Sequence, residues 1–288
     1  MTTGPGTPTN GEEPVAMLPG GGYRPLDMTR PHPARRYDFW LGGKDNFAAD
    51  RESADRIARE FPTIRTAVLE NRRFLHRAVS FLAAEAGIRQ FLDIGTGIPA
   101  APNVHDIAQS IAPESRVVYV DNDPLVVVHA RARMVSDPEG ATAYVHADLR
   151  EPEAILADPA LPTTLDLSRP VGLLLIAVLH FLDDADDPYR AVARLVEALP
   201  PGSCLALSHA TFDPLPDDTI ERLTALTSGA GHGTFRPRSR SEVARFLDGL
   251  NLVDPGLVPI VQWRPEQEPK PLASVADTAV YGAVARLT

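Results

Sequence analysis

A short glycine-containing loop is the first candidate for chemistry in this sequence. Residues 91–100 read FLDIGTGIPA, with Asp93 two residues before Gly95 and Gly97 two residues after it. Glycines directly after a strand let the backbone turn tightly and approach a ligand without a Cβ in the way. The spacing also matches the fingerprint of dinucleotide-binding loops. Asp93 would repel a bound pyrophosphate, so the loop favours a positively charged ligand carrying an ammonium and a sulfonium group.

Two further carboxylates follow β-rich runs at the same predicted edge. Asp121 comes directly after the run at 116–120, where it could accept hydrogen bonds from both hydroxyls of a ribose. Asp148 follows the run at 142–146 and could accept from the exocyclic amine of adenine. The alternatives are that Asp121 caps the next helix and that Asp148 is a solvated turn residue. Asp123, before Pro124, is interpreted as a helix cap. Three successive strands that end in Asp favour a binding edge.

These side chains need a sheet to bring them together. β-rich runs at 90–94, 116–120, 142–146, 171–178 and 203–208 alternate with helical patterns. The uninterrupted apolar run at 171–178 indicates a strand buried on both faces, as in a parallel sheet covered by helices. The alternation predicts a doubly wound α/β sheet. Two β-rich segments at 257–263 and 280–287 follow without a helix between them, so they must pair antiparallel or lie apart.

The helices have readable boundaries. An apolar stripe from Ile64 to Leu82 predicts a helix that Gly87 is placed to end. Pro102 is at a first-turn position for the next helix, and Asp123 with Pro124 opens one that runs to about residue 135. Further helices are predicted after Asp187-Pro188 and after a capping box at 239–242, SRSE.

The chain divides into three parts. Residues 1–33 are rich in Gly, Pro and Thr, and we expect a disordered or loosely attached arm. Residues 34–87 form a helical leader and lid, and residues 88–288 form the main domain.

Composition narrows the classes of function. Of 288 residues, 44% are hydrophobic and 23% charged, which is typical of a folded globular protein. The net charge of −10 argues against nucleic acid as a partner, since that affinity depends on counterion release. The one cysteine, Cys204, fits a reducing cytoplasmic compartment, and no metal site is predicted. The longest apolar run is too short to cross a membrane.

Taken together, the motifs resemble those of the class I S-adenosylmethionine-dependent methyltransferases, and within them the bacterial S-adenosyl methyltransferase group of largely unassigned substrate. The resemblance covers about residues 30–288. It rests on RRYDFWLGGKDN at 35–46, DIGTG at 93–97, YVDNDP at 119–124, HADL at 146–149, AVLHFL at 177–182 and LSH at 207–209. One departure is Pro99, where many such enzymes have a third glycine, and we expect it to stiffen the loop.

The resemblance implies a Rossmann-like, mostly parallel seven-stranded sheet with an antiparallel C-terminal hairpin, and S-adenosyl-L-methionine as cofactor. It implies that Asp93, Gly95 and Gly97 hold the methionine end, Asp121 the ribose and Asp148 the adenine. The same motifs place four further residues in the predicted cofactor site: Thr96, Asn122, Leu149 and Ala177.

The leader motif joins aromatic residues to a Gly-Gly pair. It could fold over the cofactor as a lid that excludes water, or it could be a packing strap against the sheet. Its polar residues favour the lid, and the predicted lid or substrate residues are Tyr37, Asp38, Phe39, Trp40, Gly42, Gly43, Lys44 and Asn46.

Methyl transfer needs an in-line nucleophile, and positioning with desolvation can supply most of the rate without a base. If the acceptor is a hydroxyl, His180 is the first candidate base and His209 the second; the alternative for each is a hydrogen-bonded structural histidine.

Other functions use the same loop. A NAD(P)-dependent oxidoreductase is disfavoured by Asp93 and by the lack of a Tyr-x-x-x-Lys pair, whereas a non-catalytic cofactor-binding regulatory protein would keep every motif. A nucleic-acid methyltransferase is disfavoured by AVLH at 177–180, in place of the Asn- or Asp-Pro-Pro-aromatic pattern that grips a flipped base. The sequence therefore predicts a methyltransferase of a small organic acceptor, with no membrane or nucleic-acid partner; the oligomeric state is left open.

Overall fold

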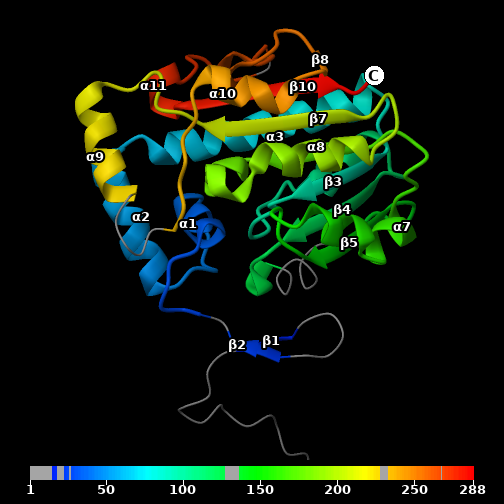
Figure 1. Ribbon diagram of the computed structural model, residues 1–288, viewed down its shortest axis with the longest axis horizontal. Coiled ribbons are helices and arrows are strands. Elements are labelled where there is room, and N and C mark those ends of the chain that lie inside the picture. Colours follow the sequence, from blue (N-terminus) through cyan, green and yellow to red (C-terminus); the bar gives the residue numbers. More distant parts are fainter. Residues whose placement is uncertain (1–14, 18–22, 26, 127–135, 228–232, 267) are drawn as a thin grey trace, which may run out of the picture.

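A computed structural model describes the chain except for residues 1–14, 18–22, 26, 127–135, 228–232 and 267 (Figure 1). Its centre is one sheet with the strand order β5-β4-β3-β6-β7-β10-β8. The strands on this path are β3 (Gln90–Ile94), β4 (Arg116–Asp121), β5 (Ala141–His146), β6 (Gly172–Ile176), β7 (Cys204–Ala210), β8 (Asn251–Leu252) and β10 (Val280–Arg286). The predicted α/β fold class is confirmed.

The five strands from β3 to β7 pair parallel. From β3 the chain steps outward through β4 to β5, and it then returns to the other side of β3 for β6 and β7. The strand order therefore reverses between β3 and β6. In open α/β sheets, ligands bind outside the carboxyl ends of the strands at this switch point.

The C-terminal strands are antiparallel, as predicted. β10 pairs with β7 along its whole length, and β8 and β9 (Val258–Pro259) both pair with the other side of β10. The strand expected at 257–263 is shorter than predicted, since the chain turns into the 3-10 helix η4 (Ile260–Gln262). Pro259 has no N–H for a longer ladder, and Trp263 is fully buried.

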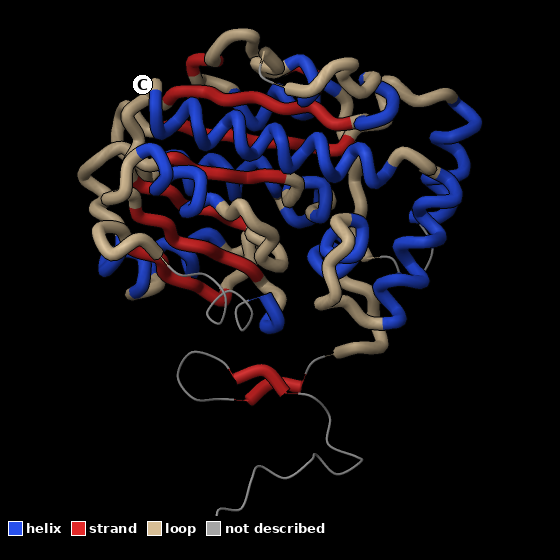
Figure 2. The backbone as a smooth tube through the Cα atoms, turned by 180° about the vertical axis from the view of Figure 1, so that it is seen from behind, coloured by secondary structure: helices blue, strands red, loops and turns tan. Residues whose placement is uncertain are grey.

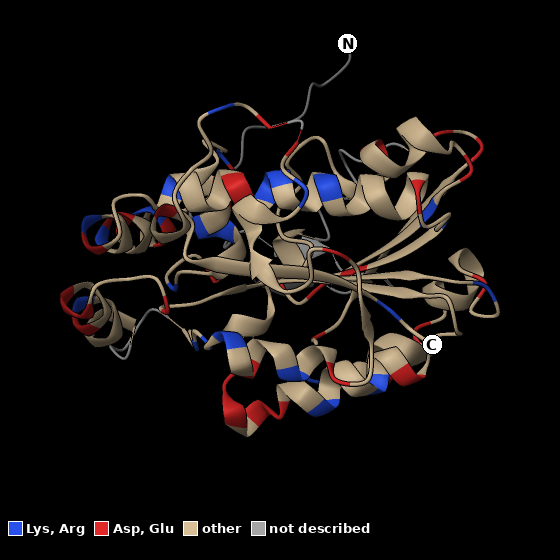
Figure 3. Ribbon diagram, turned by 90° about the horizontal axis from the view of Figure 1, so that it is seen from above, with Lys and Arg blue, Asp and Glu red and all other residues tan. Residues whose placement is uncertain are grey.

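Helices cover both faces of the sheet, which Figure 3 shows edge-on between two helical layers. Successive strand residues alternate between the two cores: Phe91 packs in the layer of α3 (Ile64–Ala84) and α4 (Val104–Ile111), and Leu92 packs in the opposite layer. The opposite layer contains α6 (Pro152–Ala157), α7 (Ala160–Thr164), α8 (Pro188–Glu197) and α10 (Arg240–Ala244) followed by η3 (Arg245–Leu247). Both strand faces are thus buried, which explains the continuous apolar runs.

Most predicted helix boundaries hold. α8 begins at Pro188, and α10 begins at Arg240, with Ser239 as its N-cap and Glu242 at the third helical position of the capping box. α4 begins later than predicted, at Val104, because Asn103 and Asp106 form a capping box just after Pro102. The helix predicted after Asp123 falls largely on residues 127–135, outside the described residues.

The leader consists of α1 (Pro33–Trp40), α2 (Ala48–Glu60) and α3. α3 lies along the sheet, and α2 stands beside α9 (Asp217–Thr227) at one end of it (Figure 2). α3 ends at Ala84, and Gly87 has the left-handed φ of +71° expected for a helix stop. Within the predicted arm, β1 (Val15–Met17) and β2 (Tyr23–Pro25) pair antiparallel. The last helix, α11 (Val275–Thr278), precedes β10. None of the helices described is long and apolar enough to span a bilayer.

The close approach of α3 to β10 gives a stability prediction. A Cβ at Gly282 would lie 2.8 Å from both Phe74 Cζ and Ile260 Cγ2. Gly282→Ala should therefore lower the free energy of unfolding by about 1 to 3 kcal/mol, because the packed core must move apart. In the matched variant Gly172→Ala, the nearest atom of Phe91 would lie at 3.0 Å, and we expect a smaller loss. Equal urea midpoints for Gly282→Ala and the wild type would contradict this packing.

Candidate active site

A cavity of about 330 Å³ opens where the carboxyl ends of β3, β4, β5 and β6 meet, beneath α1. We call it the carboxylate cavity, after Asp93, Asp121 and Asp148 in its wall. Its volume lies within the range of small-molecule sites. All nine residues predicted for cofactor binding line it: Asp93, Gly95, Thr96, Gly97, Asp121, Asn122, Asp148, Leu149 and Ala177. The sheet thus brings together positions that are 84 residues apart at the extremes.

The glycine loop needs both of its glycines. Gly95 and Gly97 have φ of +76° and +70°, a region that other residues rarely adopt. A Cβ on Gly95 would lie 2.4 Å from the side chain of Val178, whereas a Cβ on Gly97 would meet nothing within 4 Å. Gly95 therefore lets β3 and the end of β6 pack closely, and Gly97 leaves the cavity open beside the backbone.

Asp93 and Asp121 are nearly buried carboxylates at neighbouring strand ends. Asp93 accepts from the Thr96 hydroxyl, and the two oxygens of Asp121 accept from the backbone N–H groups of Gly97 at 2.8 Å and Asp123 at 2.9 Å. Burial raises the pKa of Asp93 to about 7, although the nearby Arg72 guanidinium opposes the shift, and burial raises the pKa of Asp121 to about 6. A cation in the cavity would stabilise both carboxylates.

Asp148 has a different environment. Its oxygens accept four hydrogen bonds, one from Asn122 Nδ2 and three from the backbone and guanidinium of Arg150. A carboxylate has about four lone-pair sites, so these bonds occupy all of them. The same bonds lower the pKa of Asp148 although partial burial opposes them. The Arg150 side chain is half exposed, and a ligand amine that reached Asp148 would have to displace it.

The leader is fastened to this edge by a buried ion pair. Arg35 Nε in α1 donates to Asp123 at the end of β4 over 2.9 Å, and both side chains are almost fully buried. Asp123 also accepts from the N–H of Leu125, which is the helix-cap role predicted for it. The pairing of Asp123 with the leader was not foreseen, because nothing in the sequence indicates which cation reaches it.

Three polar residues of the leader motif, Asp38, Asp45 and Asn46, bind one another. The Asp38 carboxylate accepts from the N–H of Asp45 and from Asn46 Nδ2 at 2.7 Å. Gly43 packs against that carboxylate so closely that a Cβ would lie 1.9 Å from Asp38 Oδ1. Lys44 is exposed, Gly42 has a φ of +84°, and Phe39 lies beneath the Arg65 guanidinium. These residues shape the turn after α1, whereas Tyr37 and Trp40 face cavities.

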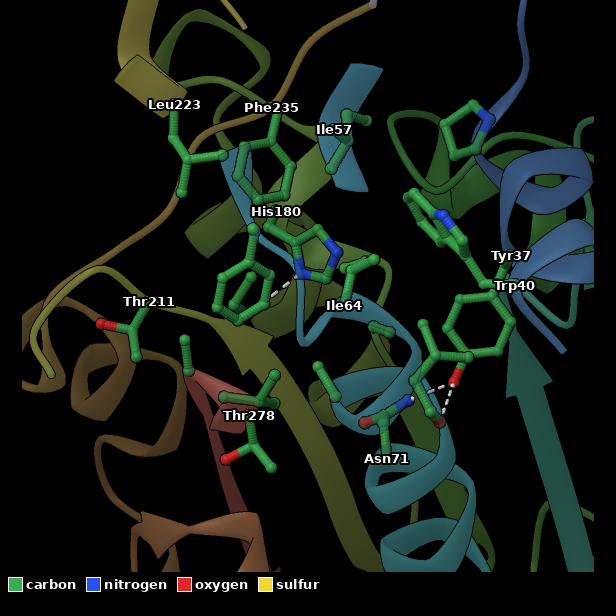
Figure 4. Close-up of a pocket in the computed structure, with 18 of the residues that line it drawn as sticks. Tyr37, Trp40, Ile57, Ile64, Asn71, His180, Thr211, Leu223, Phe235 and Thr278 are labelled. Atoms are coloured by element: carbon green, nitrogen blue, oxygen red, sulfur yellow. Dashed lines mark hydrogen bonds between the residues drawn. The ribbon is translucent and has the colours of Figure 1, made fainter. Parts of the chain in front are cut away.

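A second cavity of about 140 Å³ lies next to the first, between the leader, α9 and the ends of β6 and β7 (Figure 4). We call it the apolar cavity, since most of its wall is aliphatic or aromatic. Both cavities are lined by Pro33, Tyr37, Asn71, Ala177 and Phe181, so they meet at these residues. Ala177 has a left-handed φ of +55°, and such strained residues are concentrated at functional sites.

A chain of hydrogen bonds holds this junction in place. The N–H of Ala177 donates to Ser208 Oγ, which donates to Asn71 Oδ1 at 2.6 Å. Asn71 Nδ2 then donates to the hydroxyl of Tyr37, which donates to the carbonyl of Val68 (Figure 4). The ends of β6 and β7 are thereby joined through α3 to α1, and the wall between the two cavities is fixed.

The structure gives the two candidate histidines different environments. His180, in the 3-10 helix η1 (Leu179–Phe181), lines the apolar cavity, and its Nδ1 accepts from the N–H of Ala210. Burial lowers the pKa of His180 far below its usual range, so the ring is neutral. We assign its proton to Nε2 from this hydrogen bond. His180 can then donate to a ligand, but it has no free lone pair to act as a base.

His209 has both ring nitrogens occupied. Nδ1 donates to the carbonyl of Ala210 at 2.7 Å, and Nε2 accepts from the Arg238 guanidinium. Burial lowers its pKa to about 3, and it is absent from the described residues that line the two cavities. This geometry supports the structural alternative for His209 and not a catalytic role.

Sequence reasoning missed several residues of the site: Arg35, Asn71, Arg72, Arg150 and Ser208. One of them, Asn71, could have been found from the sequence. Asn71 lies on the apolar stripe of α3, three residues after Val68 and four before Leu75, and an uncharged polar residue on a buried face needs a partner. Arg35 and Ser208 lie within the motifs at 35–46 and 207–209, but nothing in the sequence indicates their partners, and Arg72 and Arg150 look like ordinary surface residues.

Comparison with known proteins adds independent information. The sequence model of a family described as S-adenosyl methyltransferase matches residues 21–288. A solved DUF574 family protein from Streptomyces avermitilis MA-4680 is 48% identical, with a TM-score of 0.87, over 91% of this chain and 99% of that one. A protein from Thermobifida fusca YX, described as a candidate methyltransferase, is 40% identical, with a TM-score of 0.82, over 91% and 97%. Comparison with curated proteins gives no match.

The buried carboxylate of Asp93 predicts a pH-dependent stability. Because its pKa is raised from 3.8 to about 7 in the fold, its charged form costs stability as the pH rises through about 7. Asp93→Asn removes that cost. We expect its gain in free energy of unfolding, without ligand, to be about 2 to 3 kcal/mol larger at pH 8 than at pH 5.

Asp148→Asn is the matched control for this measurement. The pKa of Asp148 is lowered from 3.8, so its charged form stabilises the fold at both pH values, and its loss should change stability equally at pH 8 and pH 5. Urea titrations of the three proteins give the comparison. A gain for Asp93→Asn that does not depend on pH would contradict the assignment.

Proposed function

The chain belongs to the S-adenosyl methyltransferase family, and we propose that this S-adenosylmethionine-dependent methyltransferase acts on a small organic acceptor by in-line transfer. One observation carries the proposal. A cavity with two buried carboxylates meets an apolar cavity at a junction formed by Tyr37, Asn71 and Ala177. A cationic methyl donor and an uncharged acceptor each have a suitable compartment there.

The residues of the carboxylate cavity fit the donor. When bound, S-adenosylmethionine supplies a methyl group on a positively charged sulfur. Asp93 and Asp121 carry raised pKa values that a nearby cation would lower again, so their burial suits a cationic ligand. Each oxygen of Asp121 accepts one backbone N–H and keeps a second lone pair for a ribose hydroxyl. The Asp148 carboxylate would accept a hydrogen bond from the adenine amine after the Arg150 guanidinium has moved away from it.

The leader closes the site as a lid. Residues of α1 line both cavities, and α1 is held by the Arg35–Asp123 ion pair and by the Tyr37 hydroxyl. A closed, water-poor site strengthens electrostatic interactions within it. We propose that Tyr37 and Trp40 contact the ligands, and that Asp38, Gly43 and Asn46 keep the lid in shape.

Catalysis in this proposal depends on positioning. His180 donates through Nε2 and His209 is fully bonded, so neither takes a proton from the acceptor. Holding two reactants in line can supply roughly 7 to 11 kcal/mol of the barrier. His180 is therefore proposed as an orienting donor. We also propose that the protein acts in the cytoplasm, because Cys204 is a buried free thiol.

Asp121 gives the main test. Asp121→Ala should weaken S-adenosylmethionine binding by well over tenfold, since two ribose hydroxyls lose their acceptor. Asp166→Ala is the matched control, because Asp166 lies at the opposite end of the sheet beside Gln90. Calorimetry with purified proteins measures both. Near-normal affinity of Asp121→Ala would show that Asp121 does not contact the donor.

The acceptor itself can be sought by incubating the protein with pooled cell metabolites and a labelled methyl donor.

Asp148 and Arg150 give a second test. Arg150→Ala frees the Asp148 carboxylate, so donor affinity should be retained or rise, whereas Asp148→Asn should lower it by about threefold to tenfold. In the double variant the effect of Arg150→Ala should vanish. If Arg150→Ala alone weakens binding as much as Asp148→Asn does, Arg150 itself contacts the donor and the competition does not exist.

A further inference from the structure

The apolar cavity has dimensions and walls that select among acceptors. Its volume is about 140 Å³, and an apolar protein cavity of roughly 150 Å³ binds benzene. Phe61, Phe212 and Phe235 contribute aromatic surface from three separate segments of the chain. The space therefore suits one six-membered ring, and a second fused ring would have to enter the carboxylate cavity, whose buried carboxylates disfavour an apolar group.

The side chains that line the apolar cavity favour an uncharged ligand. Arg36 is the one charged side chain among the described residues that line the apolar cavity. It is buried, it faces the charge of Asp50, and it donates to the Ser53 hydroxyl. A ligand carboxylate would lose its hydration and would have to share a cation that already has partners, which is unfavourable in a buried site.

Two residues of the apolar wall carry N–H donors, Trp40 in α1 and His180 in η1. The indole Nε1 of Trp40 is buried and has no hydrogen-bond partner among the described residues. The Nε2 of His180 carries the proton assigned above, because Nδ1 accepts from Ala210. Trp40 approaches from α1 and His180 from the end of β6, and Figure 4 shows both side chains in the lining of the same cavity. A buried donor without a partner costs about 1 to 3 kcal/mol, which a ligand oxygen would recover.

We propose that the apolar cavity takes a monocyclic, uncharged aromatic acceptor with an oxygen substituent, a phenol in its simplest form. The ring fills the apolar space, and its oxygen accepts from Trp40 or His180 near the junction with the carboxylate cavity. If the methyl group goes to this oxygen, the new O–C bond forms as the C–S bond breaks, and the sulfur keeps the bonding pair and leaves as a neutral thioether. The phenolic proton then passes to solvent water, because neither histidine takes it. This inference rests on the proposed function for its meaning as an acceptor site. Ligand binding to the apolar cavity can be measured without any methyl donor.

The first experiment titrates the full chain, without donor, with four probes followed by ligand-detected NMR. Phenol should bind about threefold to tenfold more tightly than toluene, which lacks the oxygen. Benzoate, which is charged, and 1-naphthol, which has two rings, should bind at least about tenfold more weakly than phenol. Equal affinities for phenol and toluene, or tighter binding of 1-naphthol, would overturn the proposal.

Variants locate the site. Ala67→Leu adds bulk at a residue that lines the apolar cavity alone, so it should abolish phenol binding and leave calorimetric affinity for S-adenosylmethionine unchanged. Trp40→Phe keeps a ring but removes the N–H, so phenol should weaken about threefold to tenfold while toluene does not. Trp263→Phe is the matched control, because its buried Nε1 is also without a partner but lies in the core. Phenol binding that survives Ala67→Leu, or an equal loss in both tryptophan variants, would refute the assignment.

The two proposals fail in different ways. If S-adenosylmethionine binds and phenol does not, the ring site is wrong and the proposed function stands. If phenol binds as expected and S-adenosylmethionine does not, the proposed function fails and the apolar cavity remains a ring-binding site.

Discussion

Two carboxylates kept away from water at adjacent strand ends are the constraint on which this site depends. Asp93 and Asp121 are both more than nine-tenths buried, and no ion pair to either is found in the described part of the chain. Backbone N–H groups and a hydroxyl hold them instead, and their pKa values rise because burial penalises their charge. A cation in this site would lower both pKa values again, and this makes a sulfonium donor a better fit than a pyrophosphate.

The leader converts this edge of the sheet into two compartments. The Arg35–Asp123 pair fixes α1 over the carboxylate cavity, and the bonds from Ala177 through Ser208 and Asn71 to Tyr37 fix the wall between the cavities. This positioning of α1 explains several of the residue types in the leader motif. Asp38, Gly43 and Asn46 bind one another and keep the turn after α1 in place, so Tyr37 and Trp40 can face the cavities.

The polarity of the two compartments matches the chemistry proposed for them. A charged donor needs carboxylates and backbone donors, and a neutral acceptor needs an apolar space with few polar atoms. A single hydrogen bond decides what His180 can do. Because the N–H of Ala210 donates to Nδ1, the proton is on Nε2, which can donate to a ligand but cannot act as a base. Arg238 holds the same turn by donating to the carbonyls of Leu179 and Leu182 and to His209. Through Arg238, His209 of the motif at 207–209 thus helps to hold the turn that carries His180.

The sequence by itself determined the parallel sheet and nine of the positions that line the carboxylate cavity, whereas the antiparallel pairing of the C-terminal strands was implied by the family resemblance. The sheet and these positions follow from local signals: apolar runs, glycines after a strand and Asp at strand ends act within a few residues. Tertiary structure alone decided that Arg35 pairs with Asp123, that Asn71 bridges β7 and α1, and that His180 donates. Those contacts join residues that are 30 to 137 positions apart in the sequence. A polar residue in a sequence does not specify its partner, because the partner is chosen by which surfaces the packed core brings together.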